Sequence, residues 1–114
     1  MNPFSAIARL WSRFTGRGPF DGGACIRLLN DPALSIVERD AAAESLAAFP
    51  TRDAVEALFK VAVTPTEDGS LRETAAHSLG AIWSEIGVDE GLLSRLPEGL
   101  RHEVLASMPS SPQA

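Results

Sequence analysis

The feature that most constrains the fold of this chain is an internal repeat with an offset of 33 residues, from position 39 to position 72. Residues 39–49, RDAAAESLAAF, align without a gap with residues 72–82, RETAAHSLGAI. The arginine, both central alanines, the serine, the leucine and a later alanine are identical, and a weaker third copy begins at Arg101. Self-similarity with a period of about 20–50 residues is typical of stacked repeats, so the sequence predicts such an architecture.

Each copy has the apolar spacing of an amphipathic helix. Tyrosine is absent and only five Phe and two Trp are present, a composition that favours helices over strands. Apolar residues of the second copy stand three or four positions apart and share one helix face; they are Leu71, Ala75, Leu79, Ile82 and Ile86. The pattern predicts three helix pairs, at 22–30 and 35–49, at 53–63 and 70–86, and at 89–96 and 98–108.

Capping signals predict where these helices begin and end. Ser35 and Ser70 are each followed three residues later by a glutamate, the pattern of a capping box, so each is expected to be an N-cap. Asp53 is expected to cap the helix over 53–63, and Gly87 is expected to end the helix over 70–86.

These residues resemble HEAT repeats, particularly the short bacterial HEAT-like class. In that family a short Asp-Pro-type turn is followed by a helix carrying Val/Leu-Arg-x-x-Ala-Ala-x-x-Leu-Gly. Residues 28–32, LLNDP, and then the first copy of the repeat match after a small insertion, and residues 67–80, EDGSLRETAAHSLG, match closely. The resemblance covers residues 22–108. It implies an all-α, right-handed α-solenoid of about three HEAT-like helix pairs preceded by an N-terminal helix.

The chain divides into three parts. Residues 1–21 are expected to form a basic amphipathic helix and a linker, residues 22–108 the repeat domain, and residues 109–114 a flexible tail. Three roles are open for the N-terminal helix: covering the first repeat, docking on a partner, or lying on an anionic membrane as a peripheral adaptor. Its apolar docking face consists of Phe4, Ile7, Leu10, Trp11 and Phe14.

Charge is distributed unevenly along the sequence. Residues 1–18 carry three arginines and no acid, whereas the other 96 residues carry seven Lys or Arg and fifteen Asp or Glu. An acidic body repels phosphate backbones, so we expect no nucleic-acid partner and favour a protein partner with a basic surface. The single cysteine, Cys25, is expected to be a small buried hydrophobe, and it fits a cytoplasmic location.

In HEAT folds the second helix of each pair lines the concave face, so the resemblance implies a binding module or adaptor that uses these helices. A toxin-neutralising immunity protein is one concrete form of that function. Trp83 is expected to be either a core residue or a surface anchor, and Arg39 and Arg72 are expected to pair with acids at repeat junctions. The candidate protein-binding residues are Asp40, Glu44, Glu73, His77, Trp83 and Ser84.

Few residues of the sequence are candidates for catalysis. His102-Glu103 resembles the iron-binding motif of the deoxyhypusine hydroxylases, but those enzymes need several such pairs and this chain has one. Ser78 and His77 are neighbours on a helix and point about 100° apart, so they form no catalytic arrangement. We therefore expect no enzyme, no metal and no cofactor. A HEAT-like metal enzyme, or a relative of the HEAT-like bilin lyases, is the alternative.

Overall fold

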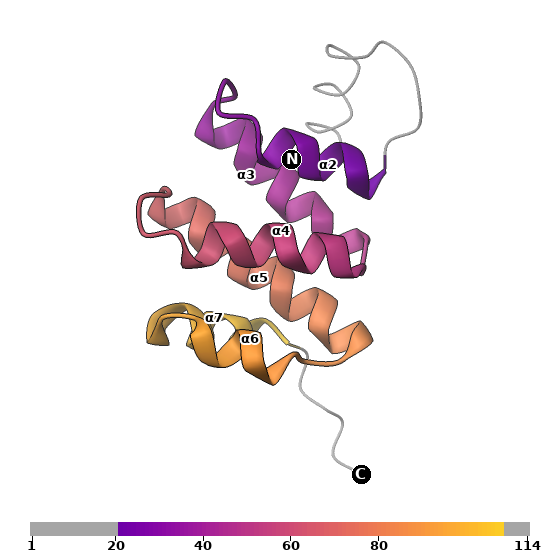
Figure 1. The fold of residues 1–114 in the computed structure, drawn as a ribbon, viewed down its shortest axis with the longest axis vertical. Helices are drawn as coiled ribbons and strands as arrows, with labels where there is room; N and C mark the ends of the chain where they lie inside the picture. Colours follow the sequence, from indigo (N-terminus) through magenta and orange to yellow (C-terminus); the bar gives the residue numbers. More distant parts are fainter. Residues whose placement is uncertain (1–20, 109–114) are drawn as a thin grey trace.

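The computed structural model describes residues 21–108, and this part of the chain is all-helical, without a strand (Figure 1). The expected N-terminal helix with its apolar face, and the expected tail, lie outside the described residues. The elements are α2 (Gly22–Leu29), α3 (Ile36–Ser45), the 3₁₀ turn η1 (Leu46–Ala48), α4 (Arg52–Val63), α5 (Gly69–Ile86), α6 (Glu90–Arg95) and α7 (Glu98–Ser107). The all-α class and the positions of all six expected helices are therefore confirmed for this part of the chain.

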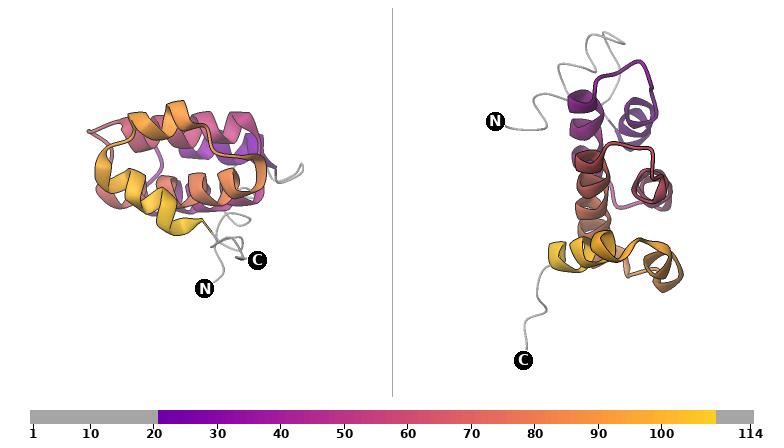
Figure 2. Two further views of the ribbon diagram at one scale, coloured as in Figure 1. Left: turned by 90° about the horizontal axis from the view of Figure 1, so that it is seen from below. Right: turned by 90° about the vertical axis from the view of Figure 1, so that its left-hand side faces the viewer.

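Successive helices alternate between two layers. In Figure 2 α3, α5 and α7 stand in one column, and α2, α4 and α6 stand in the other. The long helix α5 packs against α3, α4 and α7, so it is the element around which the rest is arranged. Arg95 of α6 lies over the ring of Phe59 of α4, 5.0 Å from its centroid, and joins the last two helices of its layer.

Small residues let the helices approach one another closely. The paired alanines of the repeat, Ala42 with Ala43 and Ala75 with Ala76, have no exposed surface. A Cβ on Gly80 would lie 2.6 Å from the carbonyl oxygen of Val104, so the backbones of α5 and α7 are nearly in contact there. Large side chains fill the space between the layers, and those with almost no exposure include Leu46, Leu58, Leu79, Ile82 and Trp83.

The observed caps confirm some of the predicted ends and correct others. Ser35 and Glu38 form both bonds of a capping box, at 3.2 and 3.0 Å, as expected. Ser70 does not cap α5, because the carboxylate of Asp68 accepts hydrogen bonds from the next backbone N–H groups and starts the helix earlier. Thr51, not Asp53, caps α4 by accepting from the backbone N–H of Ala54.

Two helix ends follow from backbone preferences. Gly87 ends α5 with φ at 98°, a conformation that favours glycine, so this prediction is confirmed. The helix expected over 35–49 tightens into η1 and ends at Phe49, whose φ of −125° and ψ of 78° are not helical, because the following Pro50 disfavours the helical conformation.

Close contact between α5 and α7 makes Gly80 sensitive to a single added methyl group. We expect Gly80→Ala to lower the free energy of unfolding by about 1–3 kcal/mol, the usual cost of overpacking. Gly69→Ala is the matched control, since a Cβ there meets nothing within 4 Å, and it should change stability by less than about 0.5 kcal/mol. Urea unfolding of the two variants checks this; equal stabilities would contradict the close packing.

Candidate functional site

One arginine marks the junction inside each helix pair. It lies in the first turn of the second helix and donates a hydrogen bond to a backbone carbonyl at the end of the first helix. Such carbonyls lack a partner within their own helix, so the arginine satisfies them. These bonds join Arg39 Nε to Leu29 (2.8 Å), Arg72 Nε to Ala62 (3.0 Å) and Arg101 Nη1 to Leu96 (3.3 Å).

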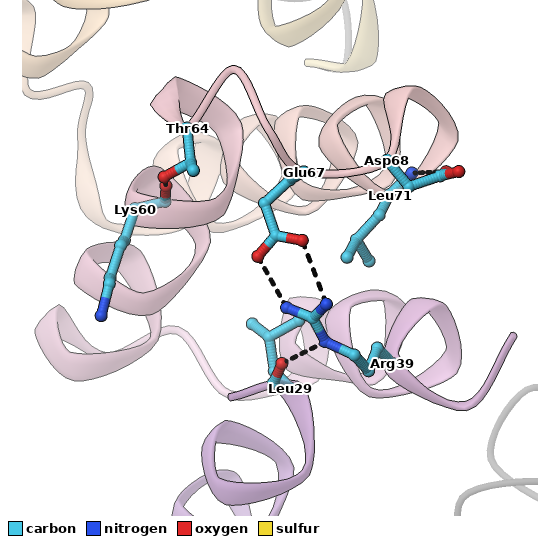
Figure 3. A network of polar contacts seen from close by, with 7 residues as sticks. All are labelled: Leu29, Arg39, Lys60, Thr64, Glu67, Asp68 and Leu71. Atoms are coloured by element: carbon cyan, nitrogen blue, oxygen red, sulfur yellow. Dashed lines mark hydrogen bonds and ion pairs between the residues drawn. The ribbon is translucent and has the colours of Figure 1, made fainter. Parts of the chain in front are cut away.

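Arg39 also reaches across to the next helix pair. Its two terminal nitrogens donate to the two carboxylate oxygens of Glu67, at 3.0 and 2.7 Å (Figure 3). The side chains are 13% and 22% exposed, so the pair is largely shielded from water. The predicted pairing of Arg39 with an acid is confirmed. For Arg72 the same prediction is wrong within residues 21–108, because Leu96 precedes the N-cap of α7 where Glu67 precedes that of α5.

Three of the predicted binding residues are exposed on the α3–α5 surface. Glu44 and Glu73 are exposed, and the side chain of His77 is 58% exposed. Glu44 and His77 line a common hollow of about 300 Å³ together with Thr74 and Ser78. Glu73 lines a different hollow nearer α7. The structure therefore brings Glu44 and His77 together and leaves Glu73 beside them.

The remaining predicted residues are less available. Trp83 is 1% exposed, so it is a core residue and not a surface anchor; it forms one wall of a hollow of about 540 Å³ between α4, α5 and α6. Ser84 is exposed, but its hydroxyl donates to carbonyls of its own helix. Asp40 is half-buried, and its Oδ1 is buried without a hydrogen-bond partner in the described part of the chain.

A cluster between α5 and α7 was not predicted. The Nδ1 atom of His77 lies 2.7 Å from Oγ of Ser107, and its Nε2 atom forms an ion pair with Glu103. Ser107 Oγ also donates to the backbone carbonyl of Glu103, at 2.7 Å. The imidazole thus bridges two residues one turn apart on α7. It holds α7 against α5 beside the contact at Gly80.

The order Ser–His–Glu in this cluster resembles that of a hydrolase triad, but its surroundings oppose that chemistry. A triad needs hydrogen-bond donors aimed at a developing oxyanion, in a site that excludes water. The hollow beside His77 instead contains the carboxylate of Glu44, whose negative charge would destabilise an oxyanion. Ser78, the neighbour in sequence, is buried and donates to the carbonyl of Ala43 at 2.8 Å. The cluster acts as a clamp between helices.

Two pKa shifts in the described part follow from local contacts. The pKa of Asp68 is lowered, mainly by hydrogen bonds from the side chain of Ser70 and the backbone N–H of Leu71, which favour its charged form as the cap of α5. Burial raises the pKa of the Cys25 thiol to about 11, and the negative charge of Asp21 contributes to the rise. Cys25 has no exposed surface.

The described residues offer neither a metal cluster nor a membrane span. No group of three or more His, Cys, Asp or Glu between residues 21 and 108 is placed to hold a metal ion. No helix in the same range is long and apolar enough to cross a bilayer. Comparison with protein-family models, with curated proteins and with solved structures gives no match. Charge and geometry are therefore the basis for assigning a function.

The burial of Cys25 predicts a thiol that reacts only when the fold opens. Because its pKa is about 11, the thiol stays protonated at pH 8 and is a poor nucleophile. We expect a thiol-specific reagent to label Cys25 slowly in the native protein and rapidly in guanidinium. Since the folded pKa lies above the usual 9.0, stability should also fall as the pH rises from 9.0 toward 11. Rapid labelling of the native protein at pH 8 would contradict this burial.

Proposed function

We propose that this chain is a HEAT-like repeat module that binds a basic surface of a partner protein through α3, α5 and α7. The observation that carries the proposal is the difference in charge between the two helix layers. Helices α3, α5 and α7 carry seven carboxylates and three arginines, a net charge of −4 with histidine neutral. Helices α2, α4 and α6 carry three carboxylates and four cations, a net charge of +1.

The three arginines of the acidic layer do little to neutralise its outer surface. Each of them donates to a carbonyl at the end of a helix in the other layer, so its guanidinium is held at a helix junction. Glu44 and Glu73 are exposed on neighbouring helices. Clustered charge of one sign steers an oppositely charged partner toward that surface and raises the association rate. A partner with a basic patch fits this face.

The HEAT-like part of the proposal is supported by the equivalence of the helix pairs. Arg39 bonds to Leu29 and Arg72 bonds to Ala62, in each case a residue ten positions earlier in the chain. Both residues of the second bond follow those of the first by the repeat offset of 33 residues. Stacking of like pairs in two layers agrees with a right-handed α-solenoid of about three repeats. Such arrays expose a broad helix surface, which suits recognition of a protein.

A toxin-neutralising immunity protein in the cytoplasm is the specific form that we propose. Tight neutralisation of a basic enzyme calls for a complementary acidic surface, and fast association driven by charge suits that role. In this form the partner is an enzyme whose activity falls when the acidic layer is bound. A bound partner enzyme that stays fully active would contradict the immunity role, while leaving the binding module in place.

Charge reversal tests the binding face. We expect Glu44→Lys combined with Glu73→Lys to weaken binding of a defined Lys/Arg-rich peptide by about tenfold, because two attractive contacts become repulsive. Wild-type binding should also weaken as salt rises. Isothermal titration calorimetry measures both effects.

The control for that experiment is Asp53→Lys combined with Glu90→Lys. It makes the same change of net charge at two exposed positions of the opposite layer, on α4 and α6. Affinity should change by less than about twofold in this variant, since the altered charges lie away from the proposed face. Equal losses in the two variants, or binding that is insensitive to salt, would show that the proposed face is wrong.

A further inference from the structure

The first junction between helix pairs shows what the arginine and the following helix each bind. Consecutive acids, Glu67 and Asp68, precede α5. The carboxylate of Glu67 accepts hydrogen bonds from both terminal nitrogens of Arg39. The carboxylate of Asp68 accepts from the first free N–H groups of α5. Two carboxylates therefore satisfy the arginine and the helix N-terminus at this junction.

The second junction has an equivalent arginine, Arg72, and an equivalent helix start, that of α7, but it lacks both acids. Pro97 is the N-cap of α7 and makes no side-chain cap, and Leu96 precedes it. The Nε atom of Arg72 is fixed by the carbonyl of Ala62, as that of Arg39 is fixed by Leu29. Its terminal nitrogens have no carboxylate partner among residues 21–108. The same donors are thus in place without their acceptors.

An open hollow occupies this junction. Its volume is about 290 Å³, and it lies between the start of α5 and the start of α7. Arg72 is half-buried at its wall. The hollow is lined by Gly69, Arg72, Glu73, Pro97, Gly99, Leu100 and Glu103.

We propose that this hollow is a binding site for a carboxylate, which Arg72 holds through its two terminal nitrogens. The Arg39–Glu67 pair in the preceding junction supplies the pattern, since the equivalent guanidinium there donates two hydrogen bonds to one carboxylate. The uncapped N-terminus of α7 adds partial positive charge on the same side. The site shares Glu73 with the proposed acidic face, but it takes an acidic ligand and does not rest on the proposed function.

The charges at the rim decide which anion the site takes. Glu73 and Glu103 also line the hollow, although Glu103 is engaged by His77. Their negative charge opposes a doubly charged phosphate more strongly than a singly charged carboxylate. A planar carboxylate also matches the fork of the guanidinium. The ligand is therefore a carboxylate, either an Asp or Glu side chain of a protein or a free carboxylic acid anion.

Side-chain NMR of the arginine Nε–Hε groups tests the site directly. We expect acetate to cause a saturable shift of the Arg72 signal, whereas sodium chloride at equal ionic strength does not. The Arg39 signal should not move, because its carboxylate is already in place. Glutamate with its α-amino and α-carboxyl groups blocked distinguishes the source of the ligand. A shift of the Arg72 signal with this probe and not with acetate supports a protein side chain as the ligand. A shift with both probes supports any small carboxylate. No saturable shift with either probe would overturn the proposal.

Three substitutions give the test internal controls. Glu67→Ala should make Arg39 respond to acetate as Arg72 does, because it empties the first junction. Gly99→Glu should abolish the response of Arg72, since a side chain at position 99 has open space around its Cβ and can place a carboxylate in the hollow. Gly99→Gln is the neutral match and should keep the response. Equal responses in the Glu and Gln variants would contradict a carboxylate site.

Discussion

The described part of the molecule depends on one kind of contact, an arginine that leaves its own helix to satisfy the carbonyl end of the preceding one. Arg39 shows it most fully, since it joins Leu29 in its own helix pair to Glu67 in the connection that leads to α5. Helix ends and charged groups are costly to bury without partners. Because this contact satisfies both, the alanines of α3 and α5 can meet in a tightly packed layer.

The same contact accounts for the electrostatic character of the surface. The arginines of the second helices are held at helix junctions by carbonyl groups, while the carboxylates of those helices outnumber them and give their layer its net negative charge. Where the sequence departs from the repeat, the hydrogen-bonding groups at the junction change. Where Glu67 and Asp68 give way to Leu96 and Pro97, the arginine and the helix start keep their donors but lose their acceptors.

Periodicity predicts the elements of this fold better than it predicts their contacts. The repeat and the apolar spacing were sufficient to place all six described helices, because they record which face of each helix is buried. The class of partner for Arg39 was also predictable, but not its identity, since Glu67 lies 28 residues away. The sequence predicts Ser70 as the cap of α5, but Asp68 takes that place, because short polar residues compete for it. The His77 cluster depends on how α5 and α7 cross, which the spacing of one helix does not encode.

A double-mutant cycle on Arg39 and Glu67 tests most directly whether the ion pair that Arg39 makes with the next helix pair holds the two pairs together. Arg39→Met, Glu67→Gln and the double variant are compared with the wild type by urea unfolding. We expect a coupling free energy of about 1–2 kcal/mol, because the pair makes two charge-assisted bonds and is largely shielded from water. Additive losses, with a coupling free energy near zero, would show that the pair is a surface contact without a structural role.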